Sequence, residues 1–231
     1  MLNLNHFKIL SFDCYGTLID WESGILNVLK PIALKNNLNL SDAQILTTYA
    51  MLETELESGK YQTYRNVLRQ VMINFADQFD FVLSESETNT LVDSVRDWPP
   101  FPDTVEALSR LKRNYKLAIL SNVDDDLFSY SSKHLKTQFD TIFTAQQIGS
   151  YKPAQRNFQH LHENIDIPQD QLLHVAQSIF HDIIPAKKMG LATVWVNRRK
   201  GKEGFGATPK AHETPDLEVA DLKTLADLVN S

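Results

Sequence analysis

The stretch FKILSFDCYGTL, residues 7–18, decides the fold. It begins with a mostly apolar run from Phe7 to Phe12, which stops at Asp13 and is followed by Gly16. A short apolar run that ends in a turn signal predicts a buried strand. This strand would place the Asp13 carboxylate at its carboxyl end, the edge where ligands bind in open α/β sheets. Further functional side chains are therefore expected at the ends of the other strands of the same sheet.

Helical periodicity follows the first strand, from about residue 21 to residue 96. Two capping boxes predict helix starts in this stretch: Ser41 with Gln44, and Ser84 with Glu87. Pro31 is expected to kink or end the first of these helices, because proline lacks a backbone N–H and clashes with the preceding turn. Residues 21–96 are therefore predicted to form an all-helical module.

The proline-rich segment WPPFP, residues 98–102, separates this module from a stretch in which strands and helices alternate. Strands are expected at residues 117–120, 141–143, 172–176 and 192–196, and helices at residues 104–113, 124–136, 154–164 and 182–189. Such alternation implies βαβ units and a parallel sheet. The polar stretch from Arg198 to Pro215 is expected to be a surface loop.

The first strand and the later ones belong to one sheet, so the helical module is an insertion between them. The predicted fold class is α/β: a doubly wound, Rossmann-like parallel sheet core with an inserted all-helical cap domain. The core domain would comprise residues 1–20 and 97–231, and the cap domain residues 21–96. The cap is expected to open and close over the sheet edge on hinges at residues 18–23 and 98–102.

Composition narrows the class of protein. The 231 residues carry 23 basic and 29 acidic side chains, a formal net charge of −6, which argues against nucleic acid as a partner. No long uncharged apolar run is present, so no membrane span or membrane partner is expected. The N-terminal sequence lacks the features of a secretory signal, which favours a cytoplasmic protein. The single cysteine, Cys14, excludes an internal disulfide and is expected to be a buried side chain rather than a nucleophile.

Side chains that can carry chemistry stand at the ends of the predicted strands. The first strand runs into Asp13, Tyr15 and Thr17, strand 117–120 into Ser121 and Asn122, and strand 172–176 into Gln177 and Ser178. Lys152 precedes one helix, and Asp182 begins another. Two carboxylates, one lysine and several hydroxyl and amide groups are thus expected to converge at one edge of the sheet.

These residues resemble the four motifs of the haloacid dehalogenase-like hydrolase superfamily. The motifs occur in order as residues 12–18 (FDCYGTL), Ser121, Lys152-Pro153 and Asp182. The resemblance implies catalytic roles for Asp13, Lys152 and Asp182, with Asp13 as a covalent nucleophile that Lys152 keeps ionised. It implies that a small anionic substrate is bound by Tyr15, Thr17, Ser121, Asn122, Gln177 and Ser178.

Two positions distinguish the branches of this superfamily. Its phosphatases carry a second aspartate two residues after the nucleophile, which protonates the leaving group, and Tyr15 stands there in this chain. They also carry an aspartate that helps to bind Mg²⁺ where this chain has Gln177. Because Mg²⁺ prefers carboxylate oxygens, no metal ligand and no cofactor is expected. Displacement of a halide tolerates both losses, because halide is a very weak base that needs no general acid.

The frame Asp-x-Tyr-Gly-Thr-Leu, residues 13–18, is similar to the L-2-haloacid dehalogenase branch. That resemblance implies that Asp13 attacks the carbon bearing the halogen and that water then hydrolyses the ester, releasing a 2-hydroxy acid. Members of the branch receive the halide on an arginine early in the cap, whereas residues 47–57 here contain no arginine or lysine. Arg65 or Arg69, on the next cap helix, is the candidate replacement.

Three functional hypotheses follow. The first is a metal-independent hydrolase that resembles (S)-2-haloacid dehalogenase. The second is a Mg²⁺-dependent phosphatase or other ester hydrolase, which would need another acid in place of Tyr15. The third is a non-catalytic binding protein that has kept the fold. Apolar surface on the cap is compatible with a homodimer in each case, and the natural substrate is left open.

Overall fold

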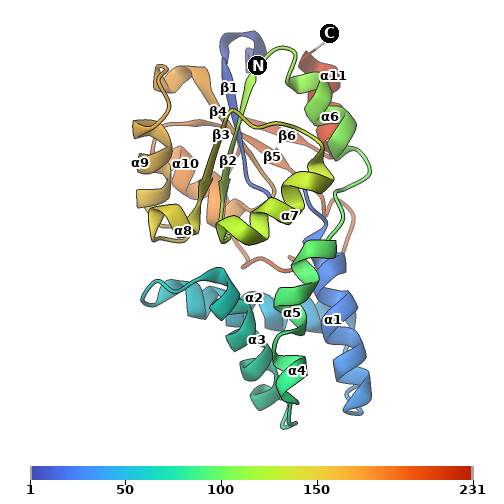
Figure 1. Cartoon of the computed structure of the whole chain (residues 1–231). Coiled ribbons are helices and arrows are strands. Elements are labelled where there is room, and N and C mark those ends of the chain that lie inside the picture. Colours follow the sequence, from blue (N-terminus) through green and yellow to red (C-terminus); the bar gives the residue numbers. More distant parts are fainter. Residues whose placement is uncertain (1, 230–231) are drawn as a thin grey trace.

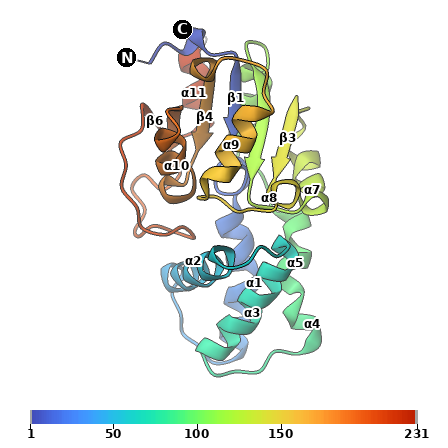
Figure 2. The same cartoon turned by 90° about the vertical axis from the view of Figure 1, so that its left-hand side faces the viewer.

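The computed structural model describes residues 2–229 and consists of an α/β core and a helical cap (Figure 1). The cap helices come from one continuous segment between the first two strands, and they lie beyond one end of the sheet. The view turned by 90° in Figure 2 shows the same separation, with the sheet above and the cap helices below. The fold class predicted from the sequence is confirmed.

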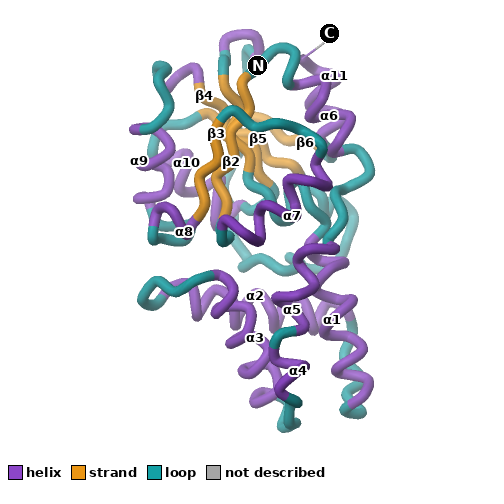
Figure 3. Tube along the Cα trace, viewed as in Figure 1, coloured by secondary structure: helices purple, strands orange, loops and turns teal. Residues whose placement is uncertain are grey.

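Among the described residues, six parallel strands form one sheet, in the order β3-β2-β1-β4-β5-β6. Figure 3 shows the strands in orange and the helices in purple. Their bounds are β1 Ile9–Phe12, β2 Lys116–Ser121, β3 Thr141–Thr144, β4 Leu172–Ala176, β5 Ala192–Val196 and β6 Leu217–Val219. All four residues of β1 are buried, as expected for a central strand covered on both faces. Only β6 is absent from the sequence-based prediction, because its three residues are interrupted by Glu218 and form no apolar run.

Helices cover both faces of the sheet. They are α6 Thr104–Leu111, α7 Asp125–Leu135, α8 Ala145–Ile148, α9 Gln155–Glu163, α10 Ile184–Lys188 and α11 Leu222–Val229, with short turns η1 Leu4–His6, η3 Gln169–Gln171 and η4 Ile179–Ile183. Helices α6, α7 and α11 pack on one face, and α8, α9 and α10 pack on the other (Figure 1). The core is therefore doubly wound.

The inserted segment is helical, as its periodicity predicts. Its elements are α1 Trp21–Lys35, α2 Asp42–Ser58, α3 Tyr64–Gln78, α4 Glu85–Thr88, α5 Thr90–Ser94 and η2 Val95–Asp97. Both predicted capping boxes are present, at the starts of α2 and α4. Helix α1 does not end at Pro31 but continues to Lys35. The buried side chains of Leu29 and Ile32, packed against the rest of the cap, hold the helix through the missing backbone hydrogen bond.

Strand register places the candidate site at the edge of the core that faces the cap. Phe12 pairs with Ile119 of β2 and Val175 of β4, so the next residue, Asp13, lies level with the last residue of β4 and with the residue before the last one of β2. The Asp13 backbone N–H continues the ladder by donating to the Val175 carbonyl at 3.2 Å. Among the described residues, no helix is both long and apolar enough to cross a membrane.

Candidate active site

Asp13 lies directly after β1, with 7% of its surface exposed. Its Oδ1 accepts a hydrogen bond from Lys152 Nζ at 2.9 Å, and its Oδ2 accepts one from Thr17 Oγ1 at 2.7 Å. The turn that brings Thr17 back to Asp13 passes through Gly16, whose φ of +89° is a conformation that favours glycine. The sequence Asp-x-x-Gly-Thr thus forms a turn in which Thr17 fixes the orientation of the Asp13 carboxylate.

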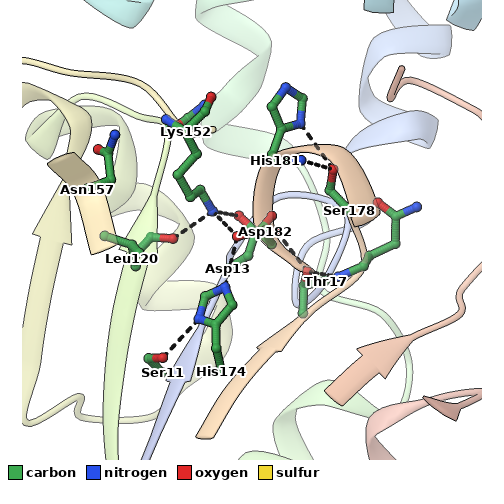
Figure 4. Close-up of polar contacts among 12 residues, drawn as sticks. Ser11, Asp13, Thr17, Leu120, Lys152, Asn157, His174, Ser178, His181 and Asp182 are labelled. Carbon is green, nitrogen blue, oxygen red and sulfur yellow. Dashed lines mark hydrogen bonds and ion pairs between the residues drawn. The ribbon is translucent and has the colours of Figure 1, made fainter. Parts of the chain in front are cut away.

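Lys152 joins the two acidic residues of the site (Figure 4). Its Nζ donates to Asp13 Oδ1, to Asp182 Oδ1 at 2.6 Å and to the Leu120 carbonyl at 2.9 Å, so all three ammonium protons have acceptors. Burial opposes the charged form of Lys152, but Asp13 and Asp182 outweigh burial and raise its pKa. Lys152 is therefore a fixed positive charge between two carboxylates.

A buried chain of hydrogen bonds fixes the orientation of the Asp182 carboxylate. This chain is absent from the sequence-based prediction. His174 Nε2 lies 2.9 Å from Asp182 Oδ1, and His174 Nδ1 lies 2.9 Å from Ser11 Oγ (Figure 4). Ser11 and His174 occupy paired positions on β1 and β4. Two polar residues within otherwise apolar strands were the signal that could have revealed this chain.

The two carboxylates differ in acidity. Burial raises the pKa of Asp13, and the Lys152 ammonium only partly opposes this. Burial acts in the same direction on Asp182, but Lys152 and His174 outweigh it and lower the pKa of Asp182. Asp182 is thus the more firmly ionised of the two acids.

The structure places the six predicted substrate-binding residues in different roles. Ser121 is 3% exposed, and its Oγ has no hydrogen-bond partner among the described residues, so it is open to a ligand. Thr17 Oγ1 donates to Asp13 and accepts the Gln177 backbone N–H at 2.9 Å. The Asn122 amide makes hydrogen bonds to both the backbone N–H and the carbonyl of Lys152, which positions that residue.

The remaining three lie around this centre. Tyr15 Oη is 2.9 Å from Ser131 Oγ, and Tyr15 is buried. Ser178 Oγ accepts the His181 backbone N–H at the start of η4. The Gln177 side chain is not among the residues that line the cavity over Asp13.

A small cavity of about 30 Å³ lies over Asp13, between the core and the cap. Its core residues include Asp13, Tyr15, Ser121, Asn122, Lys152, Ser178, His181 and Asp182, and its cap residues are Trp21, Glu53, Glu57 and Tyr64. The cap residues are absent from the sequence-based prediction. Since a cavity needs about 10–15 Å³ to hold one water molecule, this one has no room for an organic substrate unless the cap moves aside.

Two glutamates of the cap, Glu53 and Glu57, line this cavity. Glu53 Oε1 accepts hydrogen bonds from Tyr49 Oη and Tyr64 Oη, both at 2.6 Å. Burial raises the pKa of Glu53 to about 7. Glu57 Oε2 accepts one hydrogen bond, from Asn122 Nδ2 at 3.0 Å, and burial together with Glu53 raises the pKa of Glu57 well above its usual value. The four-residue spacing of Tyr49, Glu53 and Glu57 on one face of α2 was the signal that could have revealed them.

The hypothesis that Arg65 or Arg69 replaces the missing cap arginine is wrong. Arg65 pairs with Asp126 at the surface, and Arg69 Nε donates to Asn89 at 2.7 Å. Neither lines the cavity over Asp13. Both lie on α3, whose N-terminal residue Tyr64 reaches the cavity and whose following turns lead away from it.

Cys14 is buried, as expected, and its side chain does not line the cavity. Burial and the neighbouring Asp13 carboxylate raise the pKa of the thiol well above its usual value. A thiolate nucleophile at this position is therefore disfavoured.

The residues present do not fit a Mg²⁺ site. The two carboxylates at this edge, Asp13 and Asp182, are both paired with Lys152 Nζ, at 2.9 and 2.6 Å. Gln177 brings no carboxylate to this edge. Within residues 2–229, no group of three or more His, Cys, Asp or Glu side chains is placed to hold a metal ion.

Fold and site together define a class of protein: a doubly wound α/β core under a helical cap, with an aspartate–lysine–aspartate cluster at the strand ends. The model of the haloacid dehalogenase-like hydrolase family matches residues 10–196, and the chain belongs to this family.

Individual relatives agree with this assignment. The (S)-2-haloacid dehalogenase of Pseudomonas sp. strain YL is 25% identical over 232 residues, covering 97% of this chain and 95% of the relative. The pyrimidine 5'-nucleotidase of Escherichia coli strain K12 is 27% identical over 174 residues, covering 73% and 72%. The solved L-2-haloacid dehalogenase PA0810 has the same fold, with a TM-score of 0.80 at 23% identity over 96% of this chain and 99% of that one.

Proposed function

We propose that this hydrolase acts on small 2-haloacids without a metal ion, through a covalent ester on Asp13. The observation that carries the proposal is the buried Asp13 carboxylate, held by Lys152 Nζ at 2.9 Å and by Thr17 Oγ1 at 2.7 Å, with Tyr15 and Gln177 at the two positions where a phosphatase would carry further carboxylates. The Lys152 ammonium favours the ionised, nucleophilic form of Asp13. The likeness to (S)-2-haloacid dehalogenases over nearly the whole chain supports the same function.

In the first step, an Asp13 carboxylate oxygen attacks the substrate carbon that bears the halogen. The carbon–halogen bond breaks as the carbon–oxygen bond forms, and the halide leaves with the bonding electrons. Thr17 and Lys152 fix the orientation of the carboxylate during the attack. The Ser121 hydroxyl, which has no partner among the described residues, is available to the substrate carboxylate.

In the second step, water attacks the carboxyl carbon of the Asp13 ester and releases the 2-hydroxy acid. The Asp182 carboxylate, which its hydrogen bonds to Lys152 and His174 keep ionised, takes a proton from this water, and the proton passes to the alkoxide oxygen of the leaving 2-hydroxy acid. His181 also lines the cavity, and burial lowers its pKa to about 4, so it is neutral at pH 7.

The test is halide release from (S)-2-chloropropionate and from haloacetates in the presence of EDTA, with Asp13→Asn as the control. We expect release by the native chain and none by the variant. No release from any of these substrates by the native chain would contradict the proposal.

Phosphate-ester hydrolysis is the second candidate, and the 27% identity to a nucleotidase favours its inclusion. The residues around Asp13 argue against it, because Tyr15 stands where a phosphatase carries its general acid and Gln177 brings no carboxylate to bind Mg²⁺. We expect no phosphate release from a panel of phosphate esters, and Mg²⁺ to make no difference. Mg²⁺-dependent release that Asp13→Asn abolishes would reverse the ranking of the two candidates.

A further inference from the structure

The cavity over Asp13 has no free cationic group to receive a departing halide. Among the described residues that line it, Lys152 is the one lysine or arginine, and its three ammonium protons go to Asp13, Asp182 and the Leu120 carbonyl. Arg65 and Arg69 point elsewhere. If the chain releases halide, another hydrogen-bond donor on the cavity wall must face it.

Two buried oxygen atoms on this wall lack a hydrogen-bond partner among the described residues: Glu57 Oε1 and Ser121 Oγ. They come from opposite sides, Glu57 from cap helix α2 and Ser121 from the end of β2. Leaving a buried polar group unpaired destabilises the folded chain, so both atoms are available to a ligand. Ser121 suits the substrate carboxylate, which leaves Glu57 for the other end of a small substrate.

Charge balance puts a proton on Glu57. Lys152 already serves two carboxylates, Asp13 and Asp182, and no second cation lines the cavity among the described residues. Of the two cap glutamates, Glu53 accepts two tyrosine hydroxyls, whereas Glu57 accepts one amide. Glu53 is therefore better able to hold a negative charge, and Glu57 is better able to hold the proton.

The surroundings of Glu57 agree with a neutral acid. The titratable groups that face it are Glu53 and Tyr49 on α2, Tyr64 on α3, Tyr151 and Lys152 before α9, and Tyr61 and His181 across the neighbouring groove. Lys152 alone among them favours the ionised form of Glu57, and burial and Glu53 outweigh it.

We propose that Glu57, as a neutral carboxylic acid, donates the hydrogen bond that stabilises the departing halide, in place of an arginine. The inference rests on the proposed dehalogenation. Bond changes are those of the first step: Asp13 forms the carbon–oxygen bond, the halide leaves with the electron pair, and Glu57 keeps its proton. Above the pKa of Glu57 the donor is lost and a negative charge faces the leaving group.

The kinetic test compares chloride and bromide as leaving groups. Chloride is the poorer leaving group and depends more on a hydrogen-bond donor. For Glu57→Leu we expect kcat/KM to fall about 100-fold with 2-chloropropionate and about 10-fold with 2-bromopropionate, since removing one transition-state donor costs roughly 10²–10³. Glu57→Gln keeps a donor, so its chloride-to-bromide ratio of kcat/KM should be independent of pH, whereas the native ratio falls as the pH rises.

Two control variants sharpen the comparison. Glu55→Leu changes an exposed acid on the same helix and should leave the ratio unchanged. Trp21→Phe removes another N–H that lines the cavity. A ratio that Trp21→Phe alters and Glu57→Leu does not would overturn the assignment to Glu57.

A binding experiment separates this inference from the proposed function. The line width of the ³⁵Cl NMR signal reports chloride binding without turnover. We expect broadening by the native chain at pH 6 that Glu57→Leu removes and Glu57→Gln retains up to pH 9. Equal broadening by the native chain and Glu57→Leu would contradict the role of Glu57. An absence of halide release by the native chain would instead contradict the proposed function.

Discussion

At the scale of single residues, Lys152 determines what chemistry the site can perform. It is 2% exposed, so its two carboxylate partners, rather than bulk solvent, stabilise its charge, and they contribute to the stability of the fold as well as to function. Removing one partner of a buried ion pair costs roughly 3–5 kcal/mol, because the other charge is left unpaired. The Asp13–Lys152–Asp182 cluster is therefore one unit, and single substitutions within it alter folding and activity together.

Glu53 gives the first prediction, which concerns pH and stability. Its pKa is raised by burial to about 7 in the folded chain, above the usual 4.5, so the folded state binds a proton more tightly than the unfolded state. The stabilising contribution of this proton is complete below pH 4.5 and is lost as the pH rises through 7. Glu53→Gln should therefore raise the melting temperature at pH 8.5, by roughly 4 °C, and change it little at pH 5.

The measurement is thermal unfolding of both chains followed by circular dichroism across this pH range. The exposed Glu55→Gln substitution on the same helix is the control. If the melting temperatures of Glu53→Gln and of the native chain differ by the same amount at every pH, the pKa of Glu53 is not raised in the folded chain, and the prediction is wrong.

At the scale of elements, a side chain of the core caps the N-terminus of a helix in the cap domain. This contact helps to hold the cap domain over the site. The Asp124 carboxylate, 3% exposed and just before α7, accepts the backbone N–H groups of Tyr64 and Arg65 at 2.9 Å each. These are the first residues of α3, whose N-cap residue, Thr63, makes no side-chain capping hydrogen bond. Asp124 thus stabilises α3 and fixes Tyr64, which lines the cavity.

The prediction at this scale is that Asp124→Ala weakens both the fold and the site. Losing a helix-capping acceptor costs roughly 1–2 kcal/mol of unfolding free energy, and a displaced Tyr64 should raise KM more than it lowers kcat. Urea unfolding and steady-state halide release measure the two effects. Asp126→Ala, which breaks the surface pair with Arg65 and the hydrogen bond from the Leu127 backbone N–H but leaves the start of α3 capped, should cost less than 1 kcal/mol. Equal losses for the two variants would exclude a capping role for Asp124.

The sequence predicts helices and strands well where the local pattern of residues and the packing of the whole chain favour the same structure. β4 and β5 have their predicted bounds, and both capping boxes form, because these signals depend on residues close in the chain. The helix expected at residues 182–189 begins three residues earlier as the turn η4, where Ser178 caps the His181 N–H. Asp13, Lys152 and Asp182 are predictable because strand ends fix them, whereas Glu53 and Glu57 depend on how the cap packs on the core, which no local pattern encodes.

At the scale of the whole molecule, two adjacent segments connect the cap to the core. The Asp20 N–H donates to the Pro99 carbonyl at 2.8 Å, and the Phe101 N–H donates to the Leu18 carbonyl at 3.1 Å. Both chain crossings therefore lie side by side within the segments expected to be hinges. Further contacts tie the closed cap to the core, among them Arg199 with Glu22 and Tyr151 Oη with the Gln62 carbonyl.

We predict that the cap opens to admit substrate and then closes over it, because the cavity of about 30 Å³ is too small for substrate to enter while the cap is closed. Spin labels on cysteines introduced at the exposed positions Val82 in the cap and Lys202 in the core would report the distance by double electron–electron resonance. The buried Cys14 should stay unlabelled. With Asp13→Asn as the background, (S)-2-chloropropionate should narrow the distance distribution and shift its mean. An unchanged distribution at saturating ligand would rule out closure.

The covalent role of Asp13 is the central claim, and a single turnover in H₂¹⁸O tests it most directly. With the chain in excess over (S)-2-chloropropionate, the product oxygen should come from Asp13, so the 2-hydroxy acid should be unlabelled. Mass spectrometry should then find ¹⁸O in the peptide that contains Asp13, because water attacks the carboxyl carbon of the ester. Labelled product with an unlabelled Asp13 peptide would mean that water attacks the substrate directly and would contradict the account.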